Sequence, residues 1–144
     1  MLLRMLIVFV LSFLLLIGCG PELSIDFDQE QTRIIYDESL DLISFYVRLE
    51  NNGQLPANDL YARFIIDQPL QEAIGGIPEF IFTNSAGEPN LFQISGGSSY
   101  FIAEAFYLEA EIKEQDLINS VLVEIYDQKD QIVASHTIEH VTSE

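Results

Sequence analysis

The chain has 144 residues, a single cysteine, and 23 acidic against 6 basic side chains, which gives a formal net charge of −17. A field of this sign repels nucleic-acid phosphates and anionic lipid headgroups, so the charge excludes nucleic acid as a partner. The acidic side chains are spread through the sequence, as is typical of a secreted domain that stays soluble and monomeric.

The first predicted element is an apolar leader. Thirteen residues, Met5 to Ile17, are almost all apolar; Arg4 precedes them and Gly18 follows. A membrane-spanning helix needs about 20 apolar residues, so the run is too short to span and instead has the layout of a secretory signal peptide. We therefore expect residues 1–18 to be removed from the mature protein.

The end of the leader, Leu16-Ile17-Gly18-Cys19, resembles the lipobox of bacterial lipoproteins. The resemblance implies that Cys19 becomes the first residue and carries a diacylglyceryl group on its sulfur, the most nucleophilic side-chain atom near neutral pH. Two acyl chains anchor a protein stably, which predicts an extracytoplasmic domain on a short tether, residues 19–22. Two alternatives stay open: a free thiol at the end of a signal anchor, or an unmodified residue after an ordinary cleavage.

Residues 23–144 have the size of one domain, and no second cysteine is left for a disulfide. Weak strand signals at 23–28 and 32–36 come first. Clear alternation of apolar and polar side chains follows in Asp41–Glu50 and Leu60–Ile66. Further weak signals lie at 79–83 and 91–94, and alternation returns in Val121–Ile125 and Ile132–Ile138.

The segment Ser99 to Ile112 fits two structures. As a strand it places Tyr100, Ile102, Phe106 and Leu108 inward, but Glu104 then points inward too. As a helix it has an apolar stripe at spacings of four and three residues. Aromatic and β-branched residues favour the strand, which we predict up to about Glu109, with Lys113–Ile118 as a crossover that can hold one helical turn.

The stretch Phe45 to Ile66 (FYVRLENNGQLPANDLYARFII) resembles the strand, Asn-Gly turn, Pro-Ala, strand pattern of bacterial immunoglobulin-like adhesion and accessory domains. Short strands separated by turn residues point the same way. The fold class expected for residues 23–144 is therefore all-β, an immunoglobulin-like antiparallel β-sandwich. The resemblance implies a spacer or binding module outside the cell.

No catalytic residue, metal site or cofactor is expected. The sequence lacks a Gly-x-Ser-x-Gly motif, a phosphate-binding glycine loop and any Cys/His cluster. The only histidines are His136 and His140, and on one strand they would lie roughly 14 Å apart, too far to share an ion. We predict that the protein is not an enzyme.

The expected interaction surface consists of outward-facing side chains on segments 41–50 and 60–66, which we expect to be neighbouring strands. Aromatic residues and arginine are favoured at protein interfaces. The sequence thus predicts a non-enzymatic binding or structural module for another cell-envelope component. The alternative is a small acidic protein that binds calcium or a cationic ligand, with Asn51–Asp59 and Asp127–Asp130 as the calcium loops. The surface residues are Tyr46, Arg48, Tyr61, Arg63 and Ile65.

Overall fold

A computed structural model describes residues 23–144 of the chain. The predicted signal peptide, Cys19 and the tether of residues 19–22 lie outside this range. The described part contains ten strands and two short helices. In chain order these elements are β1 (Ile25–Phe27), β2 (Arg33–Asp37), β3 (Leu42–Asn51), β4 (Ala57–Ile66), α2 (Gln68–Ala73), β5 (Glu79–Ile81), β6 (Phe92–Ile94), β7 (Ser99–Tyr107), α3 (Glu114–Leu117), β8 (Val121–Tyr126), β9 (Ile132–Thr137) and β10 (His140–Ser143).

The first sheet is built around β3. One edge of β3 pairs along its whole length with β7, and the other edge pairs with β2 and, near its end, with β1, all antiparallel. The short β10 joins the far side of β2 in parallel. Since β7 pairs only with β3, it forms one edge of this sheet among the described residues.

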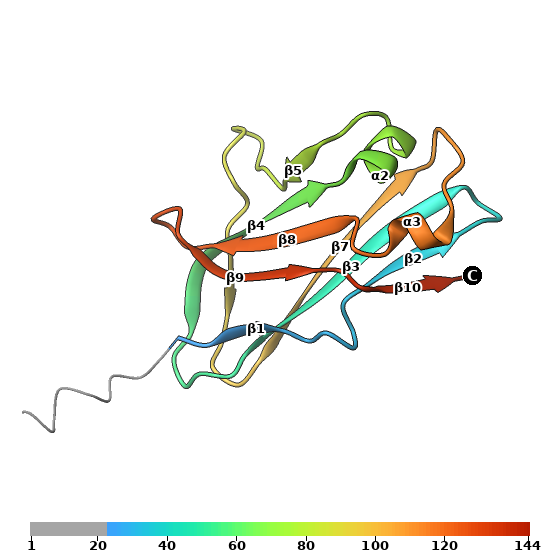
Figure 1. The fold of residues 1–144 in the computed structure, drawn as a ribbon. Helices are drawn as coiled ribbons and strands as arrows, with labels where there is room; N and C mark the ends of the chain where they lie inside the picture. The colour runs from blue at the N-terminus through green and yellow to red at the C-terminus, as the bar shows by residue number, and fades with distance from the viewer. Residues whose placement is uncertain (1–22) are drawn as a thin grey trace, which may run out of the picture.

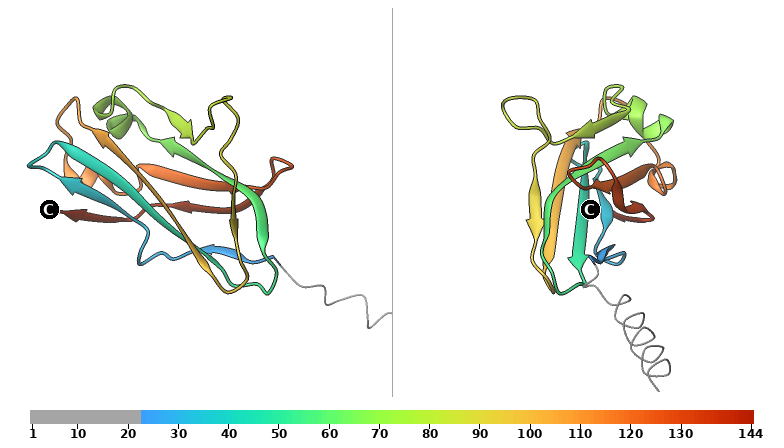
Figure 2. Two further views of the ribbon diagram at one scale, coloured as in Figure 1. Left: turned by 180° about the vertical axis from the view of Figure 1, so that it is seen from behind. Right: turned by 90° about the vertical axis from the view of Figure 1, so that its left-hand side faces the viewer.

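The second sheet is built around β4. It runs in the order β5, β4, β8, β9, all antiparallel, and β6 also pairs with β4. Figure 1 shows β4, β8 and β9 crossing in front of β3 and β7, and the view from behind in Figure 2 reverses this order. The two sheets therefore form two packed layers.

The core lies between these layers. On β3, alternate residues from Ile43 to Leu49 are fully buried, and β4 buries Leu60, Ala62, Phe64 and Ile66 in the same way. The rings of Phe45 and Phe64 stack across the sheets with centroids 6.3 Å apart. Each buried side chain of this size contributes about 1.5–3 kcal/mol, and this burial stabilises the two layers against each other.

The all-β immunoglobulin-like sandwich is confirmed, with one departure, because β10 pairs with β2 in parallel. The strand prediction for residues 99–109 is confirmed as β7, and the crossover holds one short helix, α3. The helix α2 was not predicted from the sequence; it buries Leu70 and Ala73 and ends before Gly75, where a φ of 83° suits glycine.

The predicted last strand is wrong in one respect. Ile132–Ile138 was expected as a single strand, but β9 ends at Thr137 and the chain then crosses to the first sheet to form β10. The buried Ile138 lies at this crossing, and its amide donates to the Val121 carbonyl while its own carbonyl accepts from Asn119. The last segment of the chain therefore contributes β9 to the second sheet and β10 to the first.

Candidate interaction site

The predicted interaction surface is divided between the two faces of the sandwich. The strands β3 and β4 were expected to be neighbours, but they belong to different sheets. Tyr46 and Arg48 therefore lie on the outside of the first sheet, and Tyr61, Arg63 and Ile65 on the outside of the second. The cause is that each strand has a fully apolar side, and these two sides pack against each other instead of lying next to each other in one sheet.

Buried Asn51 fixes the connection that carries the chain from β3 to β4. This side chain is only 1% exposed, and its amide donates to the carbonyls of Leu55 at 2.7 Å and Ile94 at 3.0 Å. Its side-chain oxygen accepts from the amide of Gly53 at 3.0 Å. The Asn-Asn-Gly stretch thus forms an arch between the sheets, although its composition is also typical of a tight hairpin.

On the outside of the first sheet, aromatic rings and arginines alternate. The rings of Tyr46 and Phe101 lie 5.6 Å apart, the Arg33 guanidinium lies 5.9 Å from the Tyr46 ring, and that of Arg48 lies 5.3 Å from the Phe101 ring. We call these four residues the aromatic–arginine face. Stacking of this kind holds the rings in place at the surface and contributes about 0.5–1 kcal/mol per exposed cation–π pair.

Arg48 is also held by acidic neighbours. Its side chain lies 3.4 Å from a carboxylate oxygen of Asp28 and 3.5 Å from one of Glu50, and it donates to the Ser99 hydroxyl at 3.2 Å. Half-exposed pairs of this kind add little stability, so their main effect is to fix the direction of the guanidinium.

The outer side of β7 extends this face. Phe101 is 50% exposed and Tyr107 is 77% exposed, and the exposed Ala103 and Ala105 lie between them on the same side of the strand. The surface predicted from the sequence did not include Arg33, Phe101 or Tyr107. The alternation within residues 99–107 contained the signal, because a strand that turns Ile102 inward must turn Phe101 outward.

On the outside of the second sheet, the polar groups bond to each other. Tyr61 and Tyr126 stack with centroids 5.1 Å apart, and their hydroxyls donate to Asp130 at 2.9 Å and Glu124 at 2.6 Å. Arg63 forms an ion pair with Glu79. Burial, followed by the bond to Asp130, raises the pKa of Tyr61 to about 12. These tyrosines stay neutral at physiological pH, and this face offers fewer free polar groups than the first.

The two histidines lie on different sheets. His136 on β9 is half-buried against the ring of Phe27, with centroids 5.3 Å apart, and its buried Nε2 has no hydrogen-bond partner in residues 23–144. Burial lowers the pKa of His136, so the ring is neutral at neutral pH. His140 lies on β10 in register with Arg33. The described residues contain no group of three or more His, Cys, Asp or Glu that could hold a metal ion.

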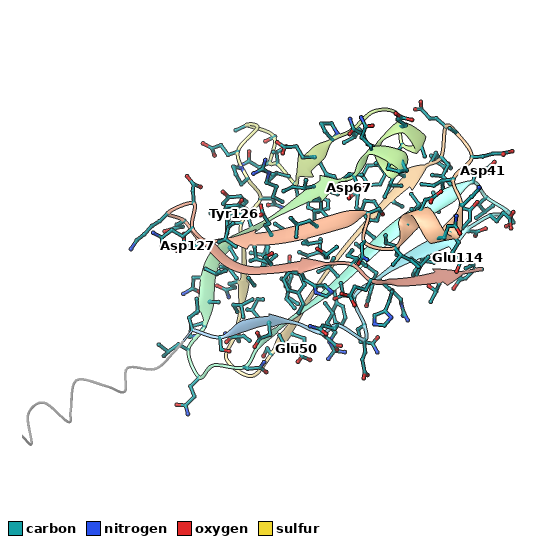
Figure 3. All side chains as sticks on the ribbon, viewed as in Figure 1. Asp41, Glu50, Asp67, Glu114, Tyr126 and Asp127 are labelled. Atoms are coloured by element: carbon teal, nitrogen blue, oxygen red, sulfur yellow. The ribbon has the colours of Figure 1, made fainter. Side chains whose placement is uncertain are left out.

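The predicted calcium loops use their oxygens within the chain. Besides the bonds of Asn51, the carboxylate of Asp127 accepts from the amides of Lys129 at 2.8 Å and Gln131 at 3.0 Å. Figure 3 places Asp127 and Tyr126 toward the end of the sandwich where the described chain begins. These loops are turns stabilised by their own Asp and Asn side chains.

The opposite end of the sandwich has an acidic groove of about 600 Å³. We call it the acidic end groove, and Figure 3 shows Asp41 at this end. Burial, together with the nearby carboxylates of Glu38, Asp41 and Glu111, raises the pKa of the Tyr36 phenol. The groove thus brings four carboxylates together with a few apolar side chains. It is lined by Tyr36, Glu38, Asp41, Leu108, Glu109, Ala110, Glu111 and Ile112.

A smaller pocket of about 200 Å³ lies beside β7, and we call it the edge pocket. Phe92 stacks on Tyr100 at its side, with centroids 4.4 Å apart, and Phe82 and Ala62 line it from the second sheet. Its lining residues, apart from Asn90, are aromatic or aliphatic, so it can take an apolar side chain. In residues 23–144, no helix is long and apolar enough to cross a bilayer.

Comparisons with known proteins give only distant similarities. No family model matches the chain, and no curated protein matches its sequence. Among solved structures, the ligand-binding region of serine-glutamate repeat protein A from Enterococcus faecium aligns over 83% of this chain and 97% of its own, with 13% identity and a TM-score of 0.41. A Niemann-Pick type C2 protein from the Japanese carpenter ant aligns over 88% of this chain and 96% of its own, with 12% identity and a TM-score of 0.38.

The Pseudomonas fluorescens alkylpurine DNA glycosylase AlkC aligns over 90% of this chain, with 14% identity and a TM-score of 0.40. The chain spans 33% of the length of that glycosylase. At these scores the similarities carry no argument about ligands or activity.

Proposed function

We propose that the protein is a lipid-anchored, extracytoplasmic, non-enzymatic module that binds another component of the cell envelope. The anchor would be a diacylglyceryl group on Cys19, by the lipobox resemblance of residues 16–19. The observation that carries the binding role is the aromatic–arginine face, and the exposed Tyr107 lies on the same side of β7 at the far end of the strand. Exposed aromatic rings next to arginines are the composition that protein interfaces favour.

The arrangement of the domain fits such a role. The described chain starts at one end of the sandwich, and its C-terminus lies at the other (Figure 1). A tether of three residues between Cys19 and Leu23 spans at most about 10 Å, which would hold the first end near the bilayer. The outer sides of both sheets and the acidic end groove would then face away from the lipid or to the side.

Site-specific photocrosslinking in cells tests the binding role. A photoreactive residue in place of Phe101 reports on the aromatic–arginine face, and one in place of Tyr61 reports on the opposite face as the matched control. The proposal predicts a discrete crosslinked product in the membrane fraction from position 101 and none from position 61. Equal products from both positions, or no product from position 101, would contradict it.

A second candidate function is supported by the acidic end groove. Four carboxylates, those of Glu38, Asp41, Glu109 and Glu111, line one groove beside the Tyr36 ring. This arrangement favours a cationic ligand, and no three of these carboxylates form a group that could hold a metal ion. Thermal melting of the full chain with and without millimolar calcium tests the metal form of this function, because a ligand that binds only the folded state raises its melting temperature. An unchanged melting temperature would exclude calcium as that ligand.

A further inference from the structure

We propose that the free edge of β7 binds an extended segment of a partner protein by strand addition, and that Glu104 selects a segment carrying Lys or Arg. The inference deepens the proposed function, because it rests on the protein being a binding module and names the chemistry of its partner. It starts from the position of β7 at the edge of the first sheet.

The free edge carries backbone groups at every second residue. The amide of Leu108 donates to the Asp41 carbonyl, and the carbonyl of Ser98 accepts from Asn51, so even-numbered residues turn their backbone groups toward β3. Backbone groups alternate in direction along an antiparallel strand. The N–H and C=O groups of Phe101, Ala103, Ala105 and Tyr107 therefore point away from β3, and no strand pairs with them in residues 23–144.

The edge of β7 is long, and within residues 23–144 it is protected only by the inward-pointing charge of Glu104 and by the segment of Asn90 and Phe92, which lies beside residues 100–103. Its pairing with β3 runs over nine residues without a bulge, whereas β9 has six residues with an irregular register and β10 has four. Protected edges usually carry Lys, Pro, bulges or inward-pointing charges. In β7 there is no Lys or Pro, and Glu104 is its one charged residue.

Glu104 points toward the interior side of the edge. It lies in register with the buried Phe45 and between Ile102 and Phe106 on the same side, and it is half-buried. Its carboxylate has no hydrogen bond or ion pair with any residue of the range 23–144. The Glu104 carboxylate, which interrupts the apolar side of β7, thus lies where a neighbouring strand would be added.

This carboxylate opposes pairing of β7 with a second copy of itself. Antiparallel pairing of two β7 strands centred between Ala103 and Ala105 would bring the two Glu104 side chains opposite or diagonal to each other, within about 8 Å. Each copy also has a net charge of −17. A partner strand that places Lys or Arg beside Glu104 instead gains an ion pair at a half-buried site. Charge complementarity therefore favours a basic segment of another protein.

The edge pocket adds a second element of specificity. It is lined by Tyr100, Ile102 and the free-edge residues Phe101 and Ala103, and it has room for one apolar side chain. Ile102 and Glu104 point to the same side of β7, one two-residue step apart. A strand added beside them would need an apolar side chain for the pocket and, two residues away, a basic side chain for Glu104.

Fluorescence anisotropy with the purified full chain in detergent tests the proposal. The probe is a labelled peptide of alternating Val and Thr in which one central Val is replaced by Lys, and its control has Glu at that position. We expect the Lys peptide to bind at least tenfold more tightly than the Glu peptide. Glu104→Gln should remove this preference while leaving residual binding.

Ala105→Pro tests strand addition itself. Its amide points to the free edge, so proline removes one partner hydrogen bond without breaking the ladder to β3. Binding of the Lys peptide should weaken at least tenfold, whereas Ala105→Ser, which keeps the amide, should bind as the natural protein does. Hydrogen exchange on the natural protein gives an independent measure: the peptide should slow exchange at Phe101, Ala103, Ala105 and Tyr107.

Three results would overturn the proposal: equal binding by Ala105→Pro, protection of amides away from β7, or equal affinity for the Lys and Glu peptides. A natural protein that sediments as a dimer, and that Ala105→Pro converts to a monomer, would show that the occupant is a second copy. Because these measurements are made on purified protein whether or not Cys19 is acylated, their failure is separate from failure of the anchor.

Discussion

Replacing Phe64 by Ala should cause one of the largest losses of stability available to this domain. Phe64 is fully buried near the end of β4. Its ring stacks on Phe80 with centroids 4.6 Å apart and on Phe45 at 6.3 Å, and it meets the edge of Phe82 at 6.0 Å. The ring thus joins both sheets through one aromatic cluster.

The expected loss follows from two contributions. Truncation of a buried Phe to Ala costs about 3–5 kcal/mol through lost burial and the cavity that remains. Lost aromatic contacts, worth about 0.5–1.5 kcal/mol beyond burial, favour the upper part of that range. We therefore expect the free energy of unfolding to fall by about 4 kcal/mol. This is a large part of the about 5–15 kcal/mol by which natural domains are stable.

Urea denaturation followed by far-UV circular dichroism measures this loss in a chain that has no tryptophan. With a slope of about 2 kcal/mol per molar urea, the midpoint should fall by about 2 M. The controls are Phe64→Leu, which keeps most of the volume and should cost about 1–1.5 kcal/mol, and the half-exposed Phe101→Ala, which should cost about 1 kcal/mol. A loss below about 1 kcal/mol for Phe64→Ala would refute the placement of this ring between the sheets.

Three further predictions concern single polar side chains. Asn51→Ala should lower the free energy of unfolding by about 2–3 kcal/mol in the same urea assay, because the carbonyls of Leu55 and Ile94 lose their donor, whereas Asn52→Ala at an exposed position should change it little. Burial lowers the pKa of His136 in the folded state below its unfolded value, so the stabilising effect of the neutral ring is complete above pH 6.5 and is lost as the pH falls through the folded pKa. The melting temperature of the natural protein should therefore fall more steeply than that of His136→Phe below pH 6.5, and parallel curves would contradict this. The Tyr61 phenol should ionise near pH 12, and an ultraviolet titration should lose one late-titrating tyrosine in Tyr61→Phe; ionisation near pH 10 would contradict both the burial of this phenol and its bond to Asp130.

The sequence was sufficient to predict which residues face the core. In β3 and β4 every second residue is apolar, and the structure buries these residues almost completely. Burial on one side of a pleated strand requires a period of two, so this property can be read from local sequence. The same reasoning identified β7 and exposed the inward position of Glu104.

Pairing between strands could not be predicted in this way. Alternation says which side of a strand is apolar, but it does not say whether the next strand lies beside it or across the core. The arch after β3 depends on the bonds of Asn51 to Leu55 and to the distant Ile94, which no local pattern contains. For this reason the predicted surface of Tyr46 and Tyr61 is divided, and its true neighbours Arg33 and Phe101 come from β2 and β7.

Mass spectrometry of the N-terminal peptide from the natural host shows whether lipid on Cys19 holds the domain at a membrane. We expect a peptide that begins at Cys19 and carries a diacylglyceryl group on the sulfur. A peptide that retains residues before Cys19, or one that begins there with a free thiol, would contradict it.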